Sequence, residues 1–117
     1  MGTNRYCMVI EIKDKHVKTY ADLHRNIKPE LIKAYKEAGA KELLVWMYKN
    51  MAIIYYECED INMVYEKVSK YEVAKKWADK VVPWFAQAPD FSGSGKVQTC
   101  EKVMDLNQQL NGDLEKY

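Results

Sequence analysis

The chain has 117 residues, enough for one domain with a proper hydrophobic core. Its 18 basic and 17 acidic residues leave a formal net charge of +1, which gives no bulk attraction for nucleic acid or for a membrane surface. No apolar run approaches the ~20 residues of a membrane span, and the N-terminus lacks the form of a signal peptide. We therefore expect a cytoplasmic protein without a nucleic-acid or membrane partner.

The cysteine and histidine pattern gives no sign of a metal or cofactor site. Cys7, Cys58 and Cys100 are odd in number and widely spaced, which predicts free thiols and no disulfide framework. His16 and His24 are eight residues apart and belong to no metal-binding motif. Neither a phosphate-binding loop nor a dinucleotide fingerprint is present. We expect no metal and no cofactor.

The N-terminal third of the sequence predicts one strand and two helices. Residues 5–12 are β-rich and almost entirely apolar, as in a buried strand. A helix is predicted over residues 16–25, with its apolar positions on one face. Pro29 suits the first turn of a second helix over residues 30–38, and Gly39 suits the position after its end.

The middle of the sequence predicts a hairpin and a further helix. Residues 42–48 and 51–58 are both rich in β-branched and aromatic residues. The two residues between them, 49–50, are a candidate tight turn. Asp60 is placed to cap a helix over residues 61–68.

The last third predicts a helix, a loop, a final strand and a tail. The capping-box pattern at residues 69–72 indicates the start of a helix, which Pro83 would end. Residues 87–95 have the composition of a loop and are long enough to form a pocket rim. A fourth strand is predicted within residues 96–106, centred on residues 99–104. Residues 107–117 are polar and aperiodic, and we expect them to form a frayed tail.

This element order predicts an α+β, ferredoxin-like (split βαβ) fold in a single domain over residues 1–106, followed by the tail. In that fold the helices cover one face of a four-stranded antiparallel sheet. The other face is too apolar here to be left in water. The simplest cover is the same face of a second copy, so we predict a C2 homodimer whose sheets form a barrel-like assembly.

Two side chains in the first predicted helix are candidates for proton transfer. Tyr20 and His24 stand at positions i and i+4 and share a helix face. Imidazole titrates near neutral pH, as an acid–base group requires. Trp77 with its neighbour Lys76, and the stretch 88–92, are the other candidate pocket residues. Each also has a structural interpretation: Tyr20 and Trp77 as core, His24 as a surface or capping residue, and Lys76 as a solvated charge.

Together these stretches resemble the L-rhamnose mutarotase family in register from about Tyr6 to Met104. The residues that carry the resemblance are Tyr20-x3-His24, Pro29-Glu30-Leu31, Gly39-Ala40, Glu57, Ser69, Trp77 and Pro89-Asp90-x-Ser92. The resemblance implies a dimeric ferredoxin-like isomerase that interconverts the α and β anomers of L-rhamnose, or of a related 6-deoxy aldose, without a cofactor. It implies that His24 is the proton donor and that Tyr20 and Trp77 contact the sugar.

Three positions depart from the family pattern. Lys76 stands where the family has the first residue of a Trp-Trp pair, Lys28 where it has a Trp, and Leu43 where it has a Tyr. Lys76 and Leu43 are thus expected at sugar-binding positions with changed chemistry, and an acidic sugar becomes a candidate substrate if the two lysines reach the pocket. Two alternatives stay open: a sugar-binding or small-molecule-binding dimer without catalysis, and a cofactor-free monooxygenase of similar fold.

Overall fold

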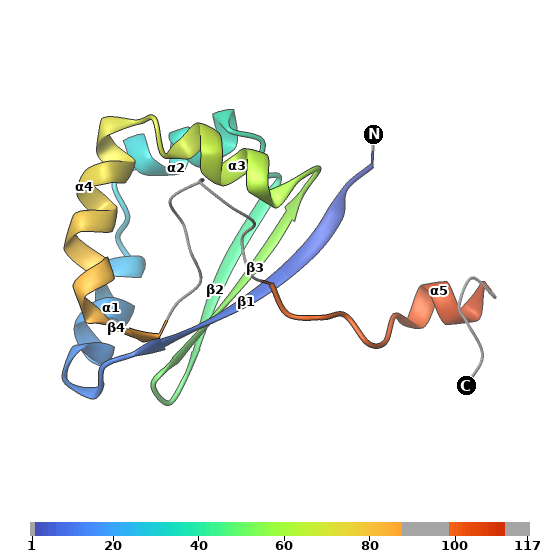
Figure 1. Ribbon diagram of the computed structural model, residues 1–117, viewed down its shortest axis with the longest axis horizontal. Helices are drawn as coiled ribbons and strands as arrows, with labels where there is room; N and C mark the ends of the chain where they lie inside the picture. The colour runs from blue at the N-terminus through green and yellow to red at the C-terminus, as the bar shows by residue number, and fades with distance from the viewer. Residues whose placement is uncertain (1, 88–98, 112–117) are drawn as a thin grey trace.

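A computed structural model describes residues 2–87 and 99–111, and it has the predicted ferredoxin-like fold (Figure 1). Four strands form one antiparallel sheet in the order β2-β3-β1-β4. The elements, in chain order, are β1 (Asn4–Ile12), the 3-10 turn η1 (Asp14–His16), α1 (Val17–His24), α2 (Pro29–Glu37), β2 (Glu42–Tyr48), β3 (Met51–Cys58), α3 (Ile61–Val68), α4 (Glu72–Val81), the 3-10 turn η2 (Val82–Trp84), β4 (Phe85–Gln87) and α5 (Leu106–Leu110).

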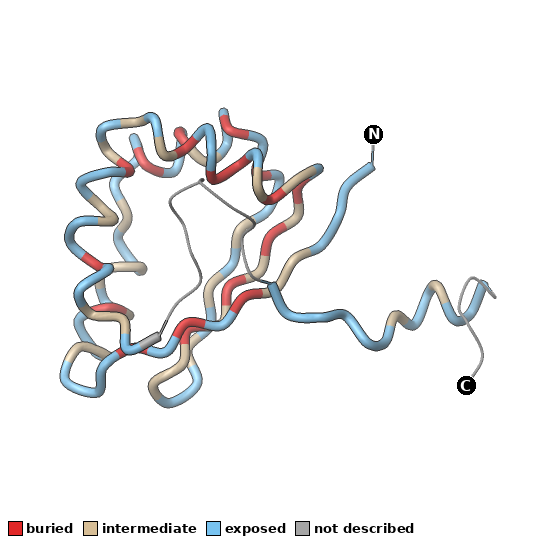
Figure 2. Tube along the Cα trace, in the orientation of Figure 1, coloured by how far each residue is buried: buried red, intermediate tan, exposed pale blue. Residues whose placement is uncertain are grey.

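The core lies between the inner face of the sheet and helices α1 to α4. Side chains alternate between the two faces of a strand, and β3 shows this in full, with every second residue buried (Figure 2). Antiparallel pairing with β1 sets Met8 opposite Ile54 and Ile10 opposite Ala52. All four side chains are buried, so the centre of the sheet is fixed by apolar contacts.

The helix and turn signals of the sequence are largely confirmed. α2 begins at Pro29, and Gly39 follows its end with φ +113°, a value that favours glycine. Asp60 caps α3 by accepting a hydrogen bond of 2.9 Å from the backbone N–H of Asn62. The hairpin turns at Lys49, which has φ 55°.

The predicted fourth strand over residues 99–104 is wrong. β4 is instead the three-residue segment Phe85–Gln87, which pairs with the end of β1 beside a register shift. Val103 is 78% exposed. Its side chain therefore makes little contact with the rest of the described protein, and apolar burial does not hold this stretch in the sheet. That stretch keeps one backbone contact with β1, a hydrogen bond of 2.6 Å from the N–H of Cys100 to the carbonyl of Cys7.

The capping box at residues 69–72 is also wrong. Ser69 directly follows α3, and its hydroxyl donates a hydrogen bond of 2.7 Å to the carbonyl of Glu66. A hydroxyl committed to the end of one helix is not available to cap the next. α4 accordingly begins at Glu72 without a side-chain cap.

The C-terminal tail is partly helical and not wholly frayed. α5 begins after Asp105, whose carboxylate accepts a hydrogen bond of 3.0 Å from the backbone N–H of Gln108. Residues 112–117, and all but the first residue of the predicted loop 87–95, lie outside the described residues.

The outer face of the sheet is apolar and open to solvent. Helices α1 to α4 lie on the other side (Figure 1). Trp46 and Tyr48 of β2 are 54% and 57% exposed, and Val9 and Leu44 are also exposed. None of the described helices is long and apolar enough to cross a membrane.

Candidate active site

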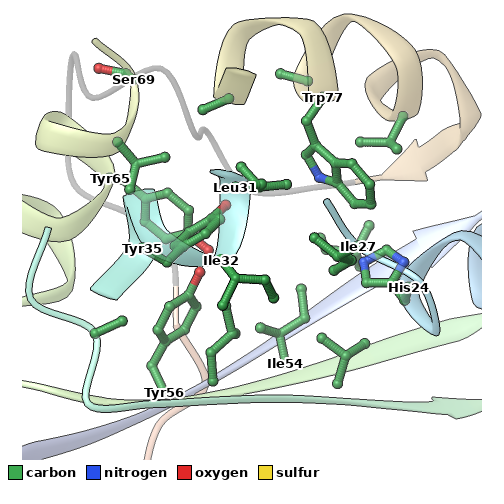
Figure 3. Close-up of a pocket in the computed structure, with 18 of the residues that line it drawn as sticks. His24, Ile27, Leu31, Ile32, Tyr35, Ile54, Tyr56, Tyr65, Ser69 and Trp77 are labelled. Atoms are coloured by element: carbon green, nitrogen blue, oxygen red, sulfur yellow. The ribbon is translucent and has the colours of Figure 1, made fainter. Parts of the chain in front are cut away.

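A cavity of about 500 Å³ lies between the inner face of the sheet and the helices. Its volume is within the range of about 300–1,000 Å³ typical of small-molecule pockets. Most of the described side chains that line it are aliphatic or aromatic, with a few polar groups among them (Figure 3). Those few polar groups therefore decide what chemistry the cavity supports.

Tyr20 and His24 meet in this cavity, as their spacing on α1 predicts. Their ring centroids are 4.2 Å apart and the ring planes are tilted by 39°. The Nδ1 atom of His24 lies 2.8 Å from the backbone carbonyl oxygen of Tyr20. A carbonyl can only accept, so Nδ1 carries the proton and donates. In neutral His24 the Nε2 lone pair is therefore free to accept a proton.

Burial favours the neutral form of both side chains. It lowers the pKa of His24 below its usual value, and the hydrogen bond to the Tyr20 carbonyl offsets this only in part. Burial also raises the pKa of Tyr20, which is 2% exposed, and the nearby Tyr35 adds to the rise. At neutral pH the site thus holds a neutral imidazole and a protonated phenol.

Trp77 packs on His24 at this end of the pocket, whereas Leu43 lines the cavity from its place opposite Tyr56 in the sheet. The Trp77 ring meets the His24 ring edge-on, with centroids 5.1 Å apart and planes at 76°. Leu43 of β2 also lines the cavity. Both walls offer apolar surface, so a ligand ring would lie against carbon at these two positions.

The two lysines that depart from the family pattern lie outside the cavity. Lys28 and Lys76 are exposed and do not line the cavity, whereas the exposed Lys75 does. The other two tryptophans also lie outside it: Trp46 is on the outer face of β2, and Trp84 stacks on His16 with centroids 5.4 Å apart. The candidate stretch 88–92 lies outside the described residues.

Sequence reasoning missed a cluster of three tyrosines in the same cavity. Tyr35, Tyr56 and Tyr65 come from α2, β3 and α3. Tyr35 and Tyr65 are expected as inward residues of their helices, but helical periodicity cannot tell which elements meet. The available signal is the tyrosine content itself, nine in 117 residues, several of them at core positions where aliphatic residues are more usual.

Among the residues that the structure describes, no metal centre accompanies these groups. Within residues 2–87 and 99–111, no cluster of three or more His, Cys, Asp or Glu side chains could hold an ion. The described charged groups at the cavity, from Lys36, Lys41, Glu42 and Lys75, are all exposed at its rim. The arrangement around Tyr20 and His24 is suited to acid–base chemistry.

Comparison with known proteins points to one family and one fold. The family model for L-rhamnose mutarotase matches residues 5–106. A solved L-rhamnose mutarotase from Formosa agariphila aligns with a TM-score of 0.65 at 18% identity, over 88% of this chain and 98% of the other. No curated protein sequence matches the chain.

Two further solved structures share the fold. A putative antibiotic biosynthesis monooxygenase from Bordetella bronchiseptica aligns with a TM-score of 0.62 at 12% identity, over 89% of this chain and all of the other. One from Nitrosomonas europaea aligns with a TM-score of 0.57, also at 12% identity, over 74% of this chain and 84% of the other. At these identities the likeness concerns the fold alone.

Proposed function

We propose that this chain, which belongs to the L-rhamnose mutarotase family, interconverts the α and β anomers of L-rhamnose or a related 6-deoxy aldose. The observation that carries the proposal is the placement of His24, with its Nδ1 committed to a backbone carbonyl and its ring lining the cavity. Mutarotation needs proton transfer at two oxygens of a sugar and no redox step, so an acid–base group in a small pocket is sufficient.

The reaction opens and recloses the pyranose ring. Nε2 of neutral His24 accepts the proton of the anomeric hydroxyl, the bond between C1 and the ring oxygen breaks, and the ring oxygen gains a proton. The open aldehyde turns about its C1–C2 bond, and the reverse steps close the ring on the other face. Because burial lowers the pKa of His24, we place its role as base first. The imidazolium so formed is then the acid that protonates the ring oxygen, the role implied by the resemblance.

The neighbouring side chains bind and orient the sugar. Tyr20 stays protonated because burial raises its pKa, so it acts as a hydrogen-bond donor and not as a phenolate base. Trp77 and Leu43 present apolar surface that suits the carbon face and methyl group of a 6-deoxy sugar. Lys28 and Lys76 do not line the cavity, so neither of these two lysines supports an acidic or phosphorylated sugar.

Exchange NMR between the anomers of L-rhamnose and of other aldoses tests the proposal. Accelerated exchange supports the mutarotase, whereas a folded protein that binds a sugar without changing its exchange rate would be a binding module. The apolar lining of the cavity favours a third reading, a cofactor-free monooxygenase, which would instead consume oxygen with an aromatic substrate.

We also propose that two copies pair through the outer face of the sheet. The exposed side chains of Leu44, Trp46 and Tyr48 on β2 and of Val9 on β1 flank the half-buried Ile53 and Tyr55 of β3, so the outer face is apolar across three strands. Burial of such a surface against a second copy removes it from water and generates a two-fold symmetric contact. A cytoplasmic location remains a prediction from the sequence.

A further inference from the structure

Two cysteines that are far apart in the sequence lie next to each other on the outer side of the sheet. The backbone N–H of Cys100 donates a hydrogen bond of 2.6 Å to the carbonyl of Cys7 on β1. Cys7 stands opposite Tyr55 of β3, and Cys100 lines the same small surface pocket as these two residues. The two thiols therefore share one side of the sheet.

The backbone contact brings the two residues to the separation that a disulfide needs. In an antiparallel pair, residues joined by such a hydrogen bond have Cα atoms about 5.5 Å apart, and a disulfide spans about 4.4–6.8 Å between Cα atoms. The pKa of Cys7 supports this closeness: burial raises it, and the neighbouring thiol of Cys100 raises it further. The two sulfur atoms can therefore be joined without a large movement of the backbone.

The three cysteines of the chain differ in access to solvent. Cys100 is exposed, Cys7 is half-buried and Cys58 is buried. A reagent in solution therefore reaches the thiol of Cys100 first. Cys7 is then placed to react with whatever forms on Cys100, whereas the thiol of Cys58 is shielded by the core.

The segment that carries Cys100 has little to hold it to the rest of the protein. We call residues 99–111 the C-terminal arm. Its apolar residues Val103 and Leu110 are 78% and 79% exposed, and α5 lies away from the sheet (Figure 1). A covalent bond at Cys100 would anchor the arm to β1 and close a loop that spans most of the chain. Cross-links that close long loops stabilise the folded state.

We propose that Cys7 and Cys100 are a redox-active pair, which a small disulfide such as oxidised glutathione converts into an internal disulfide that anchors the C-terminal arm to the sheet. Such a bond agrees with the predicted cytoplasmic location, because disulfides in that compartment are usually transient and redox-sensing.

The reaction takes two exchange steps. Cys100 loses its proton, and its sulfur attacks one sulfur of oxidised glutathione. The bond between the two glutathione sulfurs breaks, a mixed disulfide forms on Cys100, and the first glutathione leaves as a thiolate that takes up the proton. The deprotonated sulfur of Cys7 then attacks the sulfur of Cys100 and releases the second glutathione in the same way. Both cysteines are oxidised, and the reagent is reduced to two thiols.

Intact-protein mass spectrometry in a glutathione buffer tests the pair. The protein is equilibrated without oxygen near the pKa of an ordinary thiol, about 8.5, with oxidised glutathione in excess and reduced glutathione at about 0.1 mM. Neighbouring thiols have an effective concentration of at least about 1 mM, so the internal disulfide should exceed the mixed disulfide about tenfold or more. Peptide mapping without reductant identifies the linked cysteines.

Single substitutions separate the roles of the cysteines. Cys7→Ser should stop at the first step and gain the mass of one glutathione. Cys100→Ser should stay largely reduced. Cys58→Ala is the matched control and should react as the wild type does, and thermal unfolding checks that each variant is folded.

The wild type should lose the mass of two hydrogen atoms, remain a single chain under denaturing conditions and join the peptides that hold Cys7 and Cys100. Its Tm should rise by about 4 °C or more on oxidation and return to the reduced value when a thiol is added. A wild type that stops at the mixed disulfide, links Cys58, joins two chains, or gains no stability on oxidation would overturn the proposal. None of these measurements uses a sugar, so the result is independent of the proposed mutarotase activity.

Discussion

Replacement of His24 by asparagine separates its chemical role from its structural one. The Nδ2 atom of asparagine takes the place of Nδ1 and can keep the hydrogen bond that His24 makes to the Tyr20 carbonyl at 2.8 Å. The substitution removes Nε2, the atom that we assign to proton transfer. General acid–base catalysis contributes about 10²- to 10⁴-fold, or about 3 to 5 kcal/mol of barrier at 1.36 kcal/mol per factor of ten.

Stability should change far less than activity. The retained hydrogen bond is worth about 0.5–1.5 kcal/mol, and the lost part is the edge-on ring contact with Trp77. We therefore expect His24→Asn to unfold within about 2 kcal/mol of the wild type. Urea unfolding measures this difference in the same preparation that is used for exchange NMR.

The matched control is His16→Asn. His16 is the other histidine of the chain; it stacks on Trp84 and does not line the cavity. Its replacement should leave anomer exchange at the wild-type rate. A His24→Asn protein that is folded and retains more than half of the wild-type rate would refute the assignment of His24.

Four further predictions follow from described geometry. Since burial lowers the pKa of His24, the acid limb of kcat/KM should have its midpoint below about 6.5, the usual histidine value; a midpoint above it would contradict a buried base. Because the buried imidazole of His24 is more easily protonated in the unfolded chain, its contribution to the free energy of unfolding is full above that value and is lost as the pH falls. The free energy of unfolding of His24→Asn should therefore decrease less than that of the wild type between neutral and acidic pH. Gly39→Ala should lower the free energy of unfolding by about 1–3 kcal/mol in urea, because alanine is strained at the φ of +113° that Gly39 adopts. The added Cβ does not clash, since it meets only Val64 at 3.9 Å. An unchanged urea midpoint would argue against backbone strain at this position. Trp46→Glu should convert a dimer into a monomer in light scattering, and a variant that still dimerises would place the contact elsewhere.

The sequence predicts the features that depend on neighbours along the chain. Tyr20 and His24 meet because residues four apart share a helix face, and Pro29, Gly39 and Asp60 mark helix ends through local backbone chemistry. These are properties of a few consecutive residues, so no knowledge of the tertiary structure is needed to predict them.

The errors concern contacts between distant segments. Residues 99–104 have strand composition, but a strand also needs a partner, and β1 takes Phe85–Gln87 instead. Lys76 was placed with Trp77 by resemblance, yet adjacent helix residues point about 100° apart, so Trp77 faces the cavity and Lys76 the solvent. Tyr35, Tyr56 and Tyr65 come together from α2, β3 and α3, and no pattern of neighbouring residues shows that these three elements meet.

The position of β2 at the edge of the sheet has a consequence for the fate of the monomer. Residues 43–48, Leu-Leu-Val-Trp-Met-Tyr, carry no charge, proline or glycine, and this composition is that of segments that aggregate as cross-β. Only Glu42 and Lys49 flank the run as charged gatekeepers. The outer edge of such a strand presents backbone donors and acceptors to any other chain. Dimerisation through the outer face would bury the apolar face of β2, and so would also lower the tendency of the folded monomer to aggregate.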